Sequence, residues 1–349
     1  MFKRIMVLCV LLTLAIAALA AVTAEDIQNL EVELRDLIQK METDQPNYDI
    51  YKAQYDELIV EYDRMKAEFA MAQAEDKQRV GCQSKYNDAN SALRLRQYDQ
   101  AIVLLDEAIV DCPDMHLLYL GRAIARKGND DFSGAETDYL KAIEMAPDCA
   151  TLANYNLGSL YINNLNRIDD GVSRLRQALS CDSTYYKAWY QLGKVSLEKK
   201  RTTQAAGHFE KAFKIEPAYS LAAIELAKIQ LNSNCRAAIT TLVSAGGSAE
   251  DNRKSQLYQL LAAAYNNCGQ PDLALQAADE GISFLTKLRQ NKSYISGALH
   301  WEKARALQSQ EYWQEAVDEL REAARSREWR QNAEYEIEQR IKKEHPEVN

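Results

Sequence analysis

One segment of the chain, residues 186–217, constrains the fold more than any other. Two helices pack closely only where small residues of one helix meet large residues of the other. Gly193 and Ala205 would let two helices approach, and Phe209 would fill the space between them. One such hairpin cannot bury its apolar face alone, so similar hairpins are expected beside it. The pattern consists of Trp189, Leu192, Gly193, Ala205, Phe209, Ala212 and Pro217.

These spacings resemble the tetratricopeptide repeat (TPR), a helix–turn–helix unit of about 34 residues. Ser196 stands where the family pattern has a tyrosine. The resemblance covers residues 81–325 and predicts about seven repeats, the last three with weaker matches. It implies an all-α fold in which stacked hairpins form an α-α superhelix, a TPR solenoid. The small residue of the second helix recurs at Ala101, Ala135, Gly171, Ala205, Ala238, Ala274 and Ala316.

The composition agrees with a helical chain and narrows its function. Only 13 glycines and 6 prolines occur in 349 residues, and no alternating β-branched run is present. The formal net charge of −9 disfavours nucleic acid as a partner. No catalytic motif was found, and the four histidines lie far apart, so neither enzyme activity, a metal nor a cofactor is expected.

The amino terminus has the pattern of a secretory signal peptide at residues 1–24. A basic start is followed by an apolar run and a small-residue site that predicts cleavage before Glu25. An uncleaved anchor helix is the alternative, and no other segment could span a membrane. The mature protein is therefore expected to be extracytoplasmic, periplasmic or secreted. A eukaryotic secretory lumen is the second candidate, where Asn291 and Ser293 would belong to a glycosylation site.

Residues 25–80 carry apolar and aromatic residues in steps of three and four, the spacing of a coiled-coil seam. Two interpretations compete for this heptad segment. It could drive self-association into a homo-oligomer, or Pro46 could turn it into a helical hairpin that caps the repeats. The second is favoured, because a proline interrupts a continuous rod. Residues 326–349 are charged and predict a C-terminal capping helix facing water.

Six cysteines remain after removal of the signal peptide. Outside the cytoplasm an even count indicates disulfides, with fifteen connectivities available, and buried free thiols are the alternative. The paired spacing of a zinc site is absent. On the TPR frame the cysteines mark hairpin ends or successive turns, which implies pairing in sequence order: Cys82 with Cys112, Cys149 with Cys181, and Cys235 with Cys268.

The TPR resemblance also implies a concave groove that holds a peptide or partner protein. Family positions that face this groove give a wall of basic and aromatic residues, suited to an acidic peptide, a C-terminal carboxylate or an aromatic anchor. Long charged side chains that merely cover helix surface are the equally weighted alternative. The predicted groove residues are Leu118, Arg122, Tyr155, Ser159, Tyr190, Lys194, Lys228, Trp301 and Arg305.

The sequence therefore predicts a non-enzymatic interaction scaffold of the cell envelope. A chaperone-like binder of a secretory lumen and an oligomeric structural protein are the alternatives. The carboxylate clamp of cytosolic co-chaperones fits poorly, because Tyr86, Tyr119 and Leu152 stand where that clamp is polar or basic.

Overall fold

The computed structural model of the protein describes residues 22–146, 149–247, 249, 251–287 and 293–348. Every regular element in these ranges is a helix, which confirms the all-α prediction. The chain divides into two compact units, Met1–Asn129 and Asp130–Asn349. The predicted signal peptide and Asn291 lie outside the described residues, apart from residues 22–24. None of the helices described has both the length and the apolar character needed to cross a bilayer.

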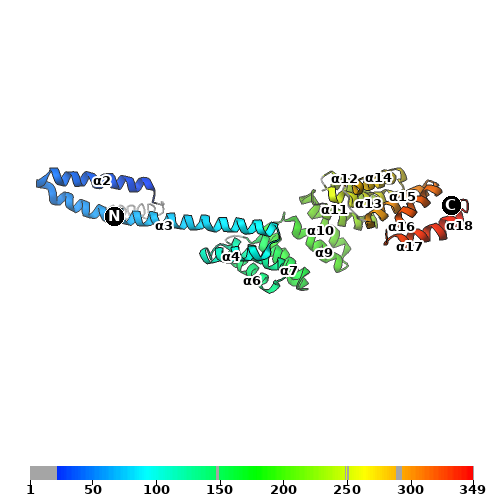
Figure 1. The fold of residues 1–349 in the computed structure, drawn as a ribbon, viewed down its shortest axis with the longest axis horizontal. Helices are drawn as coiled ribbons and strands as arrows, with labels where there is room; N and C mark the ends of the chain where they lie inside the picture. Colours follow the sequence, from blue (N-terminus) through cyan, green and yellow to red (C-terminus); the bar gives the residue numbers. More distant parts are fainter. Residues whose placement is uncertain (1–21, 147–148, 248, 250, 288–292, 349) are drawn as a thin grey trace, which may run out of the picture. The chain divides into compact units, whose positions relative to one another are not determined.

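The first unit begins with a helical hairpin (Figure 1). Thr23 and Asp26 form a capping box that starts α2. A short 3₁₀ turn containing Pro46 reverses the chain, and the Tyr62 hydroxyl donates a hydrogen bond to Glu31 Oε1 at 2.7 Å across the hairpin. The helices of this unit are α2 (Ala24–Thr43), α3 (Tyr48–Arg94), α4 (Tyr98–Asp111) and α5 (His116–Gly128).

One continuous helix, α3, joins the heptad segment to the first repeat. Helix α3 runs without interruption through residues 80 and 81, and its last turns pack against α4 and α5. Residues 70–81 are exposed throughout. The α2–α3 hairpin is therefore separated from the first repeat by bare helix and does not cover the repeat's end. Gly81 does not break the helix, and a Cβ at this position would meet nothing within 4 Å.

The second unit is a succession of helical hairpins (Figure 1). The residues predicted to form the second helices of the repeats lie on α4 in the first unit and on α6, α8, α10, α12, α14 and α16 in the second. The helices are α6 (Phe132–Met145), α7 (Thr151–Asn163), α8 (Ile168–Cys181), α9 (Tyr186–Glu198), α10 (Thr202–Ile215), α11 (Ser220–Leu231), α12 (Cys235–Gly246), α13 (Asp251–Asn267), α14 (Pro271–Lys287), α15 (Ser293–Ser309) and α16 (Trp313–Ala324).

The core of each hairpin forms where small residues of one helix meet large residues of the next. Phe209 on α10 is fully buried and lies directly against Gly193 on α9. Gly158 and Gly171 bring the backbones of α7 and α8 into similar proximity. The alanines predicted to line the second helices are completely buried: Ala101, Ala135, Ala205, Ala238, Ala274 and Ala316.

Most turns between the two helices of a repeat contain one residue with a left-handed backbone. This conformation costs an L-residue about 1–2 kcal/mol, and glycine adopts it freely. Here glycine supplies it at one turn only among those described. The residues with positive φ are Arg96, Asp130, Asn166, Lys200, Gly269 and Glu311.

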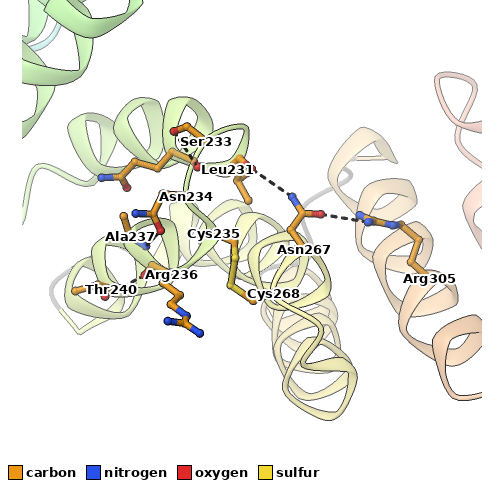
Figure 2. Close-up of a disulfide and its surroundings, with 11 residues drawn as sticks. Leu231, Ser233, Asn234, Cys235, Arg236, Ala237, Thr240, Asn267, Cys268 and Arg305 are labelled. Atoms are coloured by element: carbon orange, nitrogen blue, oxygen red, sulfur yellow. Dashed lines mark hydrogen bonds between the residues drawn. A yellow bond between two sulfur atoms is a disulfide. The ribbon is translucent and has the colours of Figure 1, made fainter.

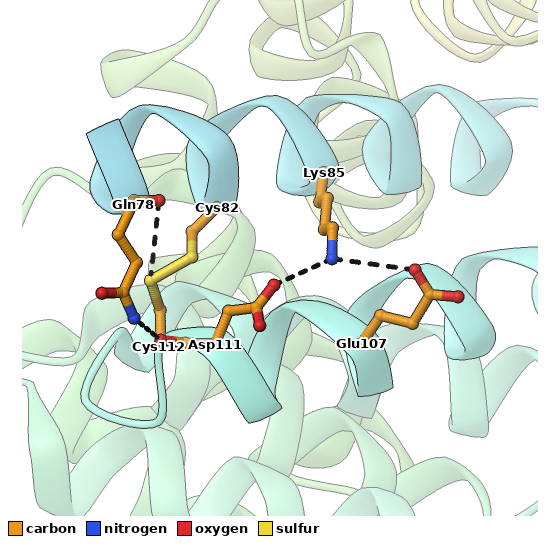
Figure 3. A network of polar contacts seen from close by, with 6 residues as sticks. All are labelled: Gln78, Cys82, Lys85, Glu107, Asp111 and Cys112. Atoms are coloured by element: carbon orange, nitrogen blue, oxygen red, sulfur yellow. Dashed lines mark hydrogen bonds and ion pairs between the residues drawn. A yellow bond between two sulfur atoms is a disulfide. The ribbon is translucent and has the colours of Figure 1, made fainter. Parts of the chain in front are cut away.

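Three disulfides confirm the predicted pairing in sequence order. Cys82 bonds Cys112, Cys149 bonds Cys181, and Cys235 bonds Cys268. The first ties α3 to the end of α4. Figure 3 shows that ion pairs from Lys85 to Asp111 (2.9 Å) and Glu107 (3.7 Å) continue the contact between these helices. The disulfide therefore reinforces a helix pair that also interacts through charged groups.

The carboxyl-terminal segment contains short helical pieces between residues 330 and 344. It consists of α17 (Arg330–Tyr335), a π-helical turn at Glu336–Ile341 and α18 (Lys342–Glu344). Ala333, Ile337 and Ile341 are buried against α16, near Val317 and Leu320. The segment thus shields the apolar face of the last repeat and exposes its charged residues.

Candidate functional site

Five tyrosines from neighbouring repeats of the second unit form one aromatic cluster. Tyr155 lies on α7, Tyr185 and Tyr186 begin α9, Tyr190 follows one turn later, and Tyr219 precedes α11. We call these five residues the tyrosine cluster. Aromatic pairs at such distances contribute about 0.5–1.5 kcal/mol each beyond their burial. The ring centroids are 5.1 Å apart for Tyr155 and Tyr185, 4.9 Å for Tyr186 and Tyr219, and 5.2 Å for Tyr190 and Tyr219.

The cluster is only partly buried, and its hydroxyl groups are available to a ligand. None of the five hydroxyls forms a hydrogen bond with a residue that the structure describes. Burial raises the pKa of Tyr185 to about 12. Burial likewise raises the pKa of Tyr190 and Tyr219, and the neighbouring tyrosines add to the shift at Tyr219. Tyr185, Tyr190 and Tyr219 thus stay protonated at neutral pH, and their hydroxyls can both donate and accept hydrogen bonds.

Two cations lie beside the tyrosine cluster. Lys194 is one helical turn beyond Tyr190 on α9, so both side chains share a face. Arg253 on α13 is near enough to Tyr190 and Tyr219 to favour their ionised forms, against the larger effect of burial. Neither Lys194 nor Arg253 forms an ion pair within the described ranges. The cluster therefore combines aromatic rings, hydroxyl groups and positive charge.

The structure brings together only some of the predicted groove residues. Tyr155, Tyr190 and Lys194 belong to the cluster and its surroundings. Ser159 is almost fully buried, and its hydroxyl accepts a hydrogen bond from Asn163 Nδ2 at 2.9 Å. Its assignment to a ligand surface is therefore corrected, because the side chain serves the packing of α7.

Two predicted groove residues lie in the first unit. Leu118 is fully buried with Ala89, Leu105 and other core residues, so its assignment to a binding surface is wrong. Arg122 pairs with Asp106 at 2.6 Å, and its guanidinium lies 5.5 Å from the centroid of the Tyr119 ring. Arg122 thus links α5 to α4.

The remaining predicted groove residues lie in the last repeats and are engaged within the chain. Lys228 pairs with Glu225 at 2.8 Å, and the Trp301 ring lies 5.4 Å from that of Trp329. Arg305 donates hydrogen bonds to Glu302 Oε2 (2.8 Å) and Asn267 Oδ1 (3.2 Å). The predicted continuous basic wall is therefore largely neutralised.

Figure 2 shows how Arg305 takes part in the structure around a disulfide. Asn267 accepts from Arg305 and donates its amide to the Leu231 carbonyl at 3.4 Å, next to the Cys235–Cys268 bond. Glu302 is buried, which raises its pKa even though Arg305 and Asn266 favour the charged form. Arg305 thus compensates a buried carboxylate and links α15 to α13, and Asn267 continues the link to α11.

Sequence reasoning missed Tyr185, Tyr186, Tyr219 and Arg253. Tyr185 and Tyr186 form a visible pair at the start of α9, and Tyr219 follows Pro217 at a repeat end. A search for aromatic residues at the starts of the first helices would have found all three tyrosines. Arg253 has no comparable signal, since its role depends on the position of α13.

Comparison with known proteins agrees with this repeat architecture. The mitochondrial import receptor subunit TOM70 of Rattus norvegicus is 26% identical over 186 residues, which are 52% of this chain and 28% of TOM70. The STIP1 homolog of Dictyostelium discoideum is 31% identical over 98 residues, or 28% of this chain and 17% of that protein. The chain spans less than a third of the length of these relatives.

Two solved structures share the fold. The C-terminal part of a TPR repeat-containing protein from Cytophaga hutchinsonii aligns with a TM-score of 0.56 and 14% identity, over 71% of this chain and 97% of that one. The PilF protein of Pseudomonas aeruginosa aligns with a TM-score of 0.51 and 19% identity, over 61% of this chain and 93% of PilF.

Stacked, disulfide-linked α-hairpins with an aromatic surface on their first helices define a helical repeat protein. Residues 186–219 match the tetratricopeptide repeat family itself. The chain therefore contains a tetratricopeptide repeat at residues 186–219, and its helical-repeat fold is similar to that of a solved TPR protein.

Proposed function

We propose that the protein is a non-enzymatic scaffold that binds a partner protein or peptide at the tyrosine cluster, outside the cytoplasm. TPR proteins generally act through protein interactions, and TOM70 is named as a receptor subunit. The observation that carries the proposal is the cluster itself. Five tyrosines whose hydroxyls form no hydrogen bond with a described residue lie beside two cations that form no ion pair with a described residue. The TPR resemblance assigns the first helices of the repeats to the binding groove.

The chemistry of the cluster favours an extended segment with an apolar or aromatic anchor and a carboxylate. Tyrosine rings offer a rigid apolar surface at a small cost in side-chain entropy, and they are enriched at binding hot spots. Lys194 and Arg253 would hold the carboxylate through charge-assisted hydrogen bonds. A backbone amide or carbonyl of the segment would pair with the tyrosine hydroxyls.

The disulfides support an extracytoplasmic site of action, with the cell envelope as the proposed compartment. All six cysteines within residues 22–348 are paired. Such bonds persist in oxidising compartments and are rare in the cytosol. Amino-terminal sequencing of the protein from an extracytoplasmic fraction should give Glu25 as the first residue. A chain that still begins at residue 1 and stays in the cytoplasm would contradict this part of the proposal.

Site-specific photo-crosslinking in the source cells tests the binding surface. A photo-reactive residue is placed at Lys187, which is exposed beside Tyr186, or at Gly207 on α10, where a side chain meets nothing within 4 Å. Adducts with a partner are expected from position 187 and not from 207. The adducts from 187 should disappear in a Lys194→Glu/Arg253→Glu variant. Identical adducts from both positions, or adducts unaffected by the charge reversal, would overturn the proposal.

A further inference from the structure

The α2–α3 hairpin of the first unit carries a groove with apolar side chains in its lining. The groove has a volume of ≈ 610 Å³ and runs between the two helices. Leu37 and Leu58 lie half-buried at its floor, and Val32 at its edge is 64% exposed. Apolar side chains in a concave surface between two helices can anchor the apolar face of a partner helix. The lining residues are Val32, Glu33, Asp36, Leu37, Gln54, Glu57, Leu58 and Glu61.

The charged residues of this groove all have the same sign. Asp36 pairs with Lys40 at 2.5 Å and Glu61 with Arg64 at 3.6 Å, each along its own helix. Glu33 and Glu57 form no ion pair with any residue in the described ranges. The groove therefore presents an apolar floor flanked by carboxylates, two of which are not neutralised.

The hairpin as a whole is strongly acidic. Residues 24–80 contain 15 acidic and 7 basic residues, so this segment accounts for −8 of the chain's net charge of −9. Two copies placed groove to groove would bring like charges together, which is unfavourable when apolar contact removes the intervening water. Charge thus disfavours a second copy as the occupant and favours a basic partner.

We propose that the α2–α3 groove binds a basic amphipathic helix of another protein. An apolar stripe of that helix would lie on Leu37 and Leu58, and Lys or Arg residues flanking the stripe would meet Glu33 and Glu57. This is the helix-in-groove mode of recognition, in which apolar anchors recur at helical spacing. The lining residues span about two turns on each helix, so the contact holds about two turns of the partner.

A designed peptide tests the proposal with the full-length protein. The probe is a labelled 18-residue helix with leucines on one face and lysines beside them, and binding is measured by fluorescence anisotropy. Its controls are a peptide with glutamates at the lysine positions and a peptide with the leucines shuffled around the helix. Binding of the probe alone, weakening at least tenfold as salt rises, is expected.

Matched charge reversals locate the binding surface. Glu33→Lys/Glu57→Lys changes the groove, whereas Glu42→Lys/Glu75→Lys changes the net charge equally at exposed positions outside it. The groove variant should bind the probe at least tenfold more weakly, and the control variant less than threefold more weakly. Circular dichroism must show equal helix content in both.

Three results would overturn this assignment. The two variants could lose affinity equally, or the shuffled peptide could bind as well as the probe, either of which indicates unspecific charge attraction. Sedimentation could instead show a dimer that Val32→Ser converts to a monomer, in which case a second copy occupies the groove.

Discussion

Phe209 leaves no room for a side chain at Gly193. A Cβ at this glycine would lie 2.5 Å from Cε1 of the Phe209 ring, well inside van der Waals contact. Phe209 is fully buried between α9 and the next repeat, so its ring cannot move aside without disturbing both. The close approach of α9 and α10 therefore depends on the absence of a side chain at residue 193.

We expect Gly193→Ala to lower the free energy of unfolding by about 1–3 kcal/mol, the usual cost of overpacking a core. Gly207→Ala on α10 is the matched control, because its Cβ would meet nothing within 4 Å. Alanine is a better helix former than glycine, so this second change should stabilise the protein by about 0.5–1 kcal/mol. Urea denaturation of both variants measures whether the free energy of unfolding falls for Gly193→Ala and rises for Gly207→Ala. Equal effects would show that α9 and α10 are not packed this closely.

The tyrosine cluster should make the protein sensitive to alkaline pH. Because the pKa of Tyr185 and Tyr219 is raised on folding, the folded state holds these protons more tightly than the unfolded state. Their contribution to stability is complete below about pH 10, the ordinary tyrosine pKa, and is lost as the pH rises through the folded values. Tyr219→Phe removes one such proton. We expect its melting temperature to fall less than that of the native protein between pH 9 and pH 11.5.

Tyr312→Phe is the control for the alkaline titration, since Tyr312 is 54% exposed. Its melting temperature should follow that of the native protein over the same range. Absorbance at 295 nm reports the ionisation of the tyrosines directly. If Tyr219→Phe and Tyr312→Phe respond identically to pH, the burial of the cluster is refuted.

The helical hairpins and the disulfides could be predicted because both follow from sequence spacing. A small residue recurs at the positions equivalent to Ala205, and a large residue recurs at those equivalent to Phe209 in most repeats. One well-matched unit therefore sets the frame for its neighbours. On that frame Cys149 and Cys181 mark the two ends of one hairpin. Residue spacing and the TPR resemblance were therefore enough to predict the helical hairpins and the disulfide pairing.

The contacts that engage the predicted groove residues within the chain could not be predicted from sequence spacing. Arg305 donates a hydrogen bond to Asn267, which lies 38 residues earlier and reaches it only when successive repeats stack. The same limit explains why Arg253 was missed. The left-handed turn residues could not be predicted either. Lys200 adopts this backbone conformation, which is usually found at glycine or asparagine.

The Cys235–Cys268 disulfide should stabilise the second unit substantially. The two residues are 33 positions apart, and a crosslink of that length contributes about 3–4 kcal/mol in the chain-entropy account. We expect Cys235→Ser/Cys268→Ser to lose this amount in urea denaturation. In this variant, a reducing agent should change the hydrogen exchange of α12 and α13 little further, because these helices no longer share a disulfide. Free thiols detected at both positions in the native protein would contradict the expectation.

Glu319 on α16 is the centre of a polar contact with α15, and the contribution of this contact to stability should depend on pH. His300 Nδ1–H donates to Glu319 Oε2 at 2.6 Å, and Lys303 lies 2.8 Å from Oε1. Burial alone would raise the pKa of Glu319, but the hydrogen bonds from His300 and Lys303 outweigh it and the pKa is lowered. The carboxylate therefore contributes stability above its ordinary pKa of 4.5, and this contribution is lost as the pH falls through the lower folded value.

We expect Glu319→Gln to reduce the free energy of unfolding by about 1–3 kcal/mol at pH 7, the range for hydrogen bonds to a charged group. At pH 3 the deficit should be smaller, because the native carboxyl is then partly protonated. Glu315→Gln is the control, since Glu315 is exposed on the same helix and pairs with no residue in the described ranges. It should leave stability within about 0.5 kcal/mol at both pH values. A deficit for Glu319→Gln that is equally large at pH 3 would mean that the contact acts through packing and not through charge.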